Sequence, residues 1–197
     1  WPISFFSFED LRLFFSLVLI AISCIIMGAG IPTTATYIIL VAVAAPALAQ
    51  LGIEPLVAHF FVFYYGVLAD ITPPVALAAY AASGIAKSNP FKTGNTAFRL
   101  GIAKALVPFV FVYSPSLLLI TGEFQTNQLI ITLVGTLIGI ALIGIAFSGY
   151  WFRPLSKYEQ ILIGIGSLFF VAPGTGSMII GLIIILPMLF LQFFKKN

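Results

Sequence analysis

Long uncharged stretches constrain this chain more than any other feature of its sequence. No charged residue occurs between Arg12 and Glu54, and only Glu123 interrupts the stretch from Lys104 to Arg153. Charged side chains make up 8% of the chain, against about 25% in a soluble domain. Because the apolar runs are long and do not alternate with polar residues, they predict membrane-spanning helices rather than barrel strands.

We therefore expect an all-α integral membrane protein, a multi-spanning helical bundle with a re-entrant hairpin and a broken helix. Two domains are predicted. The first, residues 1–121, would contain the hairpin (11–50), the broken helix (55–86, interrupted between 69 and 74) and a helix at 93–120 with an amphipathic first part, 93–104. The second, residues 122–197, would contain transmembrane helices at 128–147, 161–172 and 177–194. The middle helix is short for a full crossing, so it either extends to include 158–160 or is tilted or re-entrant.

The basic residues predict the orientation of these helices. They cluster in three places, at 87–104, at Arg153 and Lys157, and at Lys195 and Lys196. Alternating crossings put all three clusters on one side, which the positive-inside rule makes the cytoplasm. The hairpin then opens to the exterior. Two full crossings at 11–27 and 34–49 are the alternative.

The first interruption of the apolar pattern is Gly28-Ala29-Gly30-Ile31-Pro32-Thr33-Thr34. Gly28 and Gly30 can adopt backbone angles that turn carbonyl groups out of a helix, and Pro32 cannot continue one. Thr33 or Thr34 is expected to cap the helix that follows. Outward carbonyls and threonine hydroxyls are oxygen donors that suit Na⁺, so Gly28, Gly30, Thr33 and Thr34 are candidate cation ligands. A tight turn with a capping threonine is the simpler interpretation.

The second interruption is Asp70-Ile71-Thr72-Pro73-Pro74. Thr72 is expected as the N-cap of the second half-helix, with Pro73 as its first residue. The positive end of that half-helix, at Pro73 and Pro74, would face an anionic substrate at membrane depth. Asp70, the acid within this apolar segment, and Thr72 are candidate cation ligands. Alternatively, Asp70 only caps the broken backbone.

No other chemistry is indicated. The chain has one histidine and one cysteine, and its acidic residues form no pair on a helix face inside the membrane. A transition-metal site, an organic cofactor and nucleic-acid binding are therefore not expected, and neither is enzymatic activity. An intramembrane enzyme that uses Asp70 would need a second acid or a nucleophile at the same depth.

Three sequence blocks resemble a known family. They are Gly-Ala-Gly-Ile-Pro-Thr-Thr-Ala-Thr-Tyr at 28–37, Asp-Ile-Thr-Pro-Pro-Val-Ala-Leu-Ala-Ala-Tyr at 70–80 and Lys-Thr-Gly-Asn-Thr-Ala-Phe-Arg-Leu-Gly at 92–101. In this order and spacing they resemble the large membrane subunit of tripartite ATP-independent periplasmic (TRAP) transporters, and most of all the fused permease that works with TAXI-type binding proteins. Residues 148–197 resemble its C-terminal helices more loosely.

The resemblance implies an elevator-type secondary transporter in the bacterial inner membrane, driven by a Na⁺ gradient. Its cargo would be an organic acid delivered by a periplasmic TAXI-type substrate-binding protein. The other implied partners are a small membrane subunit or its fused equivalent and the N-terminal half of the permease, which this chain lacks. The alternative is a different broken-helix permease or a channel that works without a binding protein.

Overall fold

The computed structural model describes residues 8–119, 126–172 and 174–194. Over these residues the chain is helical and forms no β-strand, and five helical segments are long and apolar enough to cross a membrane. These observations confirm an all-α, multi-spanning membrane protein. The chain divides into two compact units, Trp1–Val112 and Tyr113–Asn197. The domain boundary expected between residues 121 and 122 lies outside the described residues.

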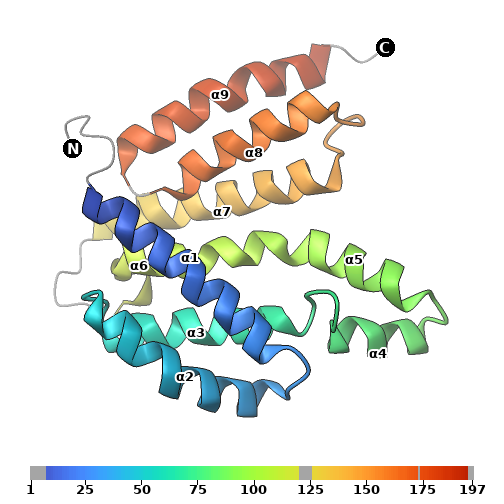
Figure 1. Ribbon diagram of the computed structural model, residues 1–197. Helices are drawn as coiled ribbons and strands as arrows, with labels where there is room; N and C mark the ends of the chain where they lie inside the picture. The colour runs from blue at the N-terminus through green and yellow to red at the C-terminus, as the bar shows by residue number, and fades with distance from the viewer. Residues whose placement is uncertain (1–7, 120–125, 173, 195–197) are drawn as a thin grey trace. The chain divides into compact units, whose positions relative to one another are not determined.

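The first unit contains a helical hairpin, a broken helix and a returning helix. Its elements are α1 (Phe8–Gly28), α2 (Thr33–Gln50), α3 (Pro55–Ala69), α4 (Leu77–Ile85), α5 (Pro90–Gly101), the 3₁₀ helix η1 (Ile102–Leu106) and α6 (Val107–Tyr113). α1 and α2 run antiparallel and both pack on α3. Figure 1 shows α4 continuing in the direction of α3, beyond the tip of the hairpin, before α5 returns alongside α4.

The core of this unit lies where α1, α2 and α3 meet. Leu17, Leu40, Val57 and Phe61 are buried there, each no more than 2% exposed. Because α1 and α2 also carry many exposed apolar side chains on their outer faces, the hairpin has an apolar surface as well as an apolar core. Such a surface suits a hydrocarbon environment and not water.

The helix expected to continue to residue 120 ends earlier. It begins at Pro90, tightens to a 3₁₀ helix at 102–106 and stops at Tyr113, because the backbone of Ser114 is not helical (φ −143°, ψ 70°). Ser114 precedes Pro115, and the residue before a proline is sterically disfavoured in the α conformation. The expectation of one helix through residues 105–120 was therefore wrong.

The second unit is a set of three helices that follows the short 3₁₀ helix η2 (Pro115–Leu118). They are α7 (Thr126–Ser148), α8 (Lys157–Val171) and α9 (Thr175–Phe194). α8 packs against both others. It begins before residue 161, as the option of borrowing 158–160 allowed, because Ser156 and Glu159 form a capping box at its start.

Polar contacts tie the α7–α8 loop to the end of α9. Arg153 forms an ion pair with Glu159, and the Gln192 amide donates a hydrogen bond to the same carboxylate over 3.2 Å. Gln192 is buried, at 1% exposure. A buried polar group is costly unless it is hydrogen-bonded, so this network fixes where α9 lies against α8.

Candidate functional site

The first break is a short turn between α1 and α2. α1 ends at Gly28, and Gly30 has a positive φ of 85°, which only glycine adopts readily. The expected threonine cap is absent: Pro32 occupies the cap position without a side-chain bond, and Thr33 is already the first residue of α2. The proline φ of −55° is compatible with that position, so the Thr33 hydroxyl is left for another partner.

The second break differs from expectation at the start of the second half-helix. Thr72 does not cap α4; its hydroxyl donates a hydrogen bond of 2.7 Å to the carbonyl of Leu68, at the end of α3. Residues 73–75 form a turn with a cis Pro73–Pro74 peptide, and α4 begins only at Leu77. The expected helix start at Pro73 or Pro74 was therefore wrong. Pro73 precedes a proline, and this disfavours the helical conformation at Pro73.

The two breaks lie against each other. The Thr33 hydroxyl donates a hydrogen bond to Oδ2 of Asp70 over 3.1 Å, although the residues are 37 positions apart. A Cβ atom added to Gly30 would lie 3.5 Å from a methyl group of Val75. The backbone N–H of Ala78, in the first turn of α4, donates to the carbonyl of Asp70 over 3.1 Å. The carboxylate of Asp70 therefore lies between the two broken segments.

Four helix ends meet at this point, which we call the junction. They are the C-termini of α1 and α3 and the N-termini of α2 and α4. The end of α1 touches the end of α3, since a Cβ on Gly28 would lie 3.1 Å from that of Ala69. Helix C-termini carry partial negative charge and attract cations, whereas N-termini attract anions. The junction thus presents both kinds of helix end beside a carboxylate.

The remaining candidates contribute differently. Thr34 is exposed and lies next to Thr33 in the first turn of α2. The hydroxyl proton of Thr72 is engaged by Leu68, which leaves the lone pairs of its oxygen. The carbonyl of Pro74 accepts a hydrogen bond of 2.6 Å from the Tyr80 hydroxyl, which fixes the loop before α4.

One residue of the junction, Thr36, was not singled out from the sequence as a site residue. Thr36 is 1% exposed and packs its methyl group between Gly28 and Gly66, while its hydroxyl bonds the carbonyl of Ile31 at 3.0 Å. It therefore joins α1, α2 and α3 beneath the junction. No local pattern distinguishes Thr36 from Thr33 or Thr34, because their roles depend on which helix each one faces.

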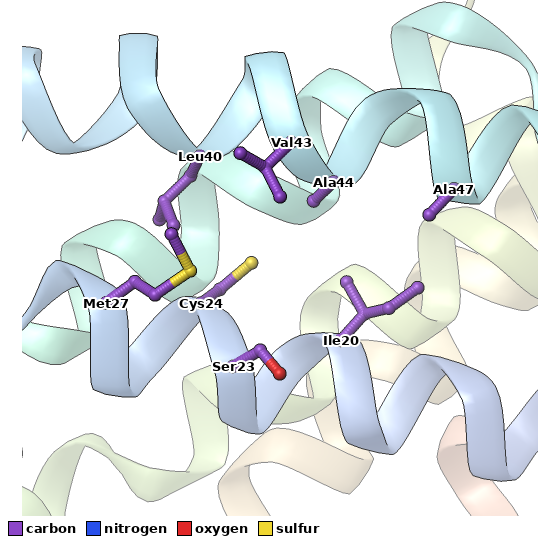
Figure 2. Close-up of a pocket in the computed structure, with 8 residues that line it drawn as sticks. All are labelled: Ile20, Ser23, Cys24, Met27, Leu40, Val43, Ala44 and Ala47. Carbon is purple, nitrogen blue, oxygen red and sulfur yellow. The ribbon is translucent and has the colours of Figure 1, made fainter.

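A cavity of about 160 Å³ lies between the arms of the hairpin. Figure 2 shows its lining, which comes from α1 and α2: Ile20, Ser23, Cys24, Met27, Leu40, Val43, Ala44 and Ala47. The lining is almost entirely apolar, and the Ser23 hydroxyl bonds its own helix at the carbonyl of Leu19. The cavity therefore offers no group that would hold an ion or a carboxylate. Among the described residues, no group of three or more His, Cys, Asp or Glu side chains is placed to hold a metal ion.

The fold and the junction together define a class of protein: a multi-pass helical membrane protein whose helices break at one common point. Within transporters, paired broken helices of this kind bind substrate and coupling ion.

The family model described as "Tripartite ATP-independent periplasmic transporter, DctM component" matches residues 7–126, which is more than half of the chain. The chain belongs to this family of TRAP transporter permease components. The matched residues include both breaks and the whole of α1 to α6. Neither the search of curated proteins nor the search of solved structures found a match.

Proposed function

We propose that this chain is the part of a TRAP permease that binds Na⁺ and an organic acid together and imports both across the bacterial inner membrane. The observation that supports this most is the hydrogen bond from Thr33 to Asp70, which joins the two broken segments at one carboxylate. The proposal makes the protein a transporter and not an enzyme.

The donor atoms at the junction fit a sodium ion. Asp70 supplies a carboxylate and Thr33 a hydroxyl, and the chain turns at Gly28 and Gly30 beside them. The carbonyl groups of these glycines, with the hydroxyls of Thr34 and Thr72, complete the proposed set of oxygen ligands. Oxygen-only donor sets suit hard cations and not the softer transition metals. The C-termini of α1 and α3 add negative potential.

An anionic substrate would be held beside the ion by the N-termini of α2 and α4. Pro73 and Pro74 have no N–H groups to donate, so in this proposal they shape the wall of the site while the first turn of α4 supplies the positive potential. Ion and anion then attract each other directly. Because each raises the affinity of the other, a Na⁺ gradient can drive accumulation of the acid.

The position of the hairpin tip supports a re-entrant hairpin. α3 is about 22 Å long for its 15 residues, so a broken helix that enters at Glu54 reaches the junction inside a hydrocarbon core of about 30 Å. The tip at Gly30 lies at that same junction, next to Val75. We therefore propose that α1 and α2 enter and leave on the same, outer side of the membrane.

The family name describes one component of a three-part transporter. We propose that the other parts are a periplasmic TAXI-type substrate-binding protein and a small membrane subunit or its fused equivalent. We further propose that an N-terminal permease half completes the substrate site in an elevator mechanism. These partners would deliver the acid and provide the surface past which the hairpin and broken helix move.

Reconstitution of the complete permease in proteoliposomes tests this function. The cargo would be a carboxylate identified by thermal-shift screening of the binding protein. We expect uptake that needs both an inward Na⁺ gradient and the binding protein. Thr33→Val should abolish the Na⁺-dependent uptake, whereas Thr33→Ser, which keeps the hydroxyl, should retain it. Uptake that continues without Na⁺ and without the binding protein would instead identify a channel and overturn the proposal.

A further inference from the structure

α5 has a polar face that hydrocarbon cannot solvate. Lys92, Asn95, Thr96 and Arg99 recur at helical spacing and are all exposed. The opposite face packs on the broken helix: a Cβ on Gly94 would lie 2.8 Å from the ring of Tyr80, and Gly101 is buried directly against Ile71. The polar face therefore points away from α4.

The contact between Gly101 and Ile71 shows how far each residue of the polar face lies from the junction along the membrane normal. Ile71 belongs to the junction, so the end of α5 lies level with it. At about 1.5 Å per residue, Asn95 and Thr96 lie roughly 8 Å from that level and Lys92 roughly 13 Å. Since α3 is about 22 Å long, the junction lies roughly 8 Å from the cytoplasmic edge of a hydrocarbon core of about 30 Å. Arg99 then lies inside the core, where a lipid-facing charge is costly, Asn95 and Thr96 lie at its edge, and Lys92 lies beyond it.

The charged residues in and around α5 are all basic. Between Ile71 and Gly122 the sequence contains Lys87, Lys92, Arg99 and Lys104 and no acidic residue. On α5, Phe91 and Leu100 are exposed apolar residues on either side of the polar face. The polar face is therefore a bounded, positively charged strip that runs from the level of the junction to the cytoplasmic end of α4 and α5. Such a strip raises the local concentration of anions.

We infer that this strip lines the aqueous path by which the transported organic anion leaves the junction for the cytoplasm. The inference rests on the proposed function, because it takes the junction as the site and the cargo as an anion. Lys92 and Arg99 would attract the carboxylate electrostatically. Between them, the side chains of Asn95 and Thr96 would form hydrogen bonds with water along the path.

Thiol labelling of the complete permease in membrane vesicles tests this path without knowing the cargo. In a background with Cys24→Ala, which replaces the one cysteine of these 197 residues, and with any cysteine elsewhere in the permease replaced, Asn95→Cys and Thr96→Cys should react with impermeant methanethiosulfonates added on the cytoplasmic side. Leu100→Cys, at one apolar edge and deeper than Asn95, and Phe91→Cys, at the other apolar edge and nearer the cytoplasmic end of α5, are the controls, and both should react far more slowly. Equal reaction of Leu100→Cys and Asn95→Cys, or no reaction at Asn95 and Thr96, would overturn the inference.

The charge of the reagent tests the preference for anions. After correction for reactivity with free 2-mercaptoethanol, an anionic sulfonatoethyl reagent should react at Asn95→Cys about 10-fold faster than a cationic trimethylammonium reagent. Lys92→Gln with Arg99→Gln should bring the ratio close to one. A ratio that does not respond to these substitutions would contradict a path selective for anions.

Two further comparisons distinguish this path from a lipid-binding surface and from a failure of the proposed Na⁺ coupling. If anionic lipid headgroups covered the strip, labelling would be fast in phosphatidylcholine vesicles and blocked by phosphatidylglycerol, and this result would overturn the path. Labelling does not require transport. Cytoplasmic, anion-selective labelling in a permease that shows no Na⁺-dependent uptake would therefore refute the proposed Na⁺ coupling while supporting the path.

Discussion

Gly28 lies directly against Ala69, so the C-terminal ends of α1 and α3 pack closely together. A Cβ atom on Gly28 would lie 3.1 Å from the Cβ of Ala69 and 3.0 Å from the methyl group of Thr36. Two helix C-termini, whose partial negative charges repel, are thus held together at the junction. This arrangement suits a place where a cation binds between them.

Gly28→Val should therefore disturb the junction. The added methyl groups have no room, and overpacking of this kind typically costs about 1–3 kcal/mol. We expect a lower midpoint of thermal unfolding in detergent and loss of Na⁺-dependent uptake. Gly84→Val is the control, since nothing lies within 4 Å of a Cβ at Gly84. If both variants behave alike, close packing at Gly28 is not important.

Tyr65 ties the broken helix to the 3₁₀ segment that follows α5. Its side chain is 2% exposed, and its hydroxyl donates a hydrogen bond to the carbonyl of Ala105 in η1. Tyr65→Phe removes the donor but keeps the ring, so we expect a loss of stability of about 1–2 kcal/mol. Tyr64→Phe, which retains the ring contact with Phe111, should change the unfolding midpoint far less. Equal effects would show that the hydroxyl of Tyr65 contributes nothing specific.

Glu159 gives the second unit a dependence on pH. Burial raises the pKa of Glu159, but hydrogen bonds from Ser156 and the charge of Arg153 outweigh burial and hold the pKa below its ordinary value of 4.5. A lowered pKa means that the stabilisation is complete above pH 4.5 and is lost as the pH falls through the folded-state pKa. Glu159→Gln should lower stability at pH 7 by about 1–3 kcal/mol.

Unfolding midpoints measured from pH 7 to pH 3 test this sign. The midpoints of the parent protein and Glu159→Gln should converge as the pH falls. Glu9→Gln is the control, because the Glu9–Arg12 pair is exposed, with an N–O distance of 3.6 Å, and such pairs contribute little. A constant difference between the parent protein and Glu159→Gln across the whole range would show that ionisation of Glu159 is irrelevant.

Much of the fold could be predicted from the sequence, because membrane helices carry their signal locally. The bounds of α3 are the expected ones, and those of α2, α7 and α9 fall within two residues of them. Apolar run length decides these elements, and the bilayer sets that length. The capping pattern at Thr72 predicts a helix that begins at Pro73, and this prediction is wrong because Pro73 stands before Pro74, which restricts its backbone.

The contact between Thr33 and Asp70 could not be derived from spacing. Each residue stood out as polar in an apolar segment, but a hydrogen bond across 37 positions depends on how α2 packs on α3. That packing is set by Thr36, which fits between Gly28 and Gly66. The sequence identifies the glycines and threonines, and only the three-dimensional arrangement shows which of them meet.

Sodium-dependent thermal stabilisation tests the central claim, that the two breaks form one cation site, without needing the cargo. A ligand that binds only the folded state stabilises it by about 2.7 kcal/mol at 100 times its dissociation constant. The complete permease should therefore unfold at a higher temperature in NaCl than in KCl of equal ionic strength.

The decisive measurement is this Na⁺-specific shift in Thr33→Val, Asp70→Asn and the double variant. Our account predicts that each single variant loses most of the shift, that the double variant loses little more, and that Thr33→Ser keeps it, because both side chains serve one ion. Single variants that retain the full shift, or losses that simply add in the double variant, would contradict a shared site.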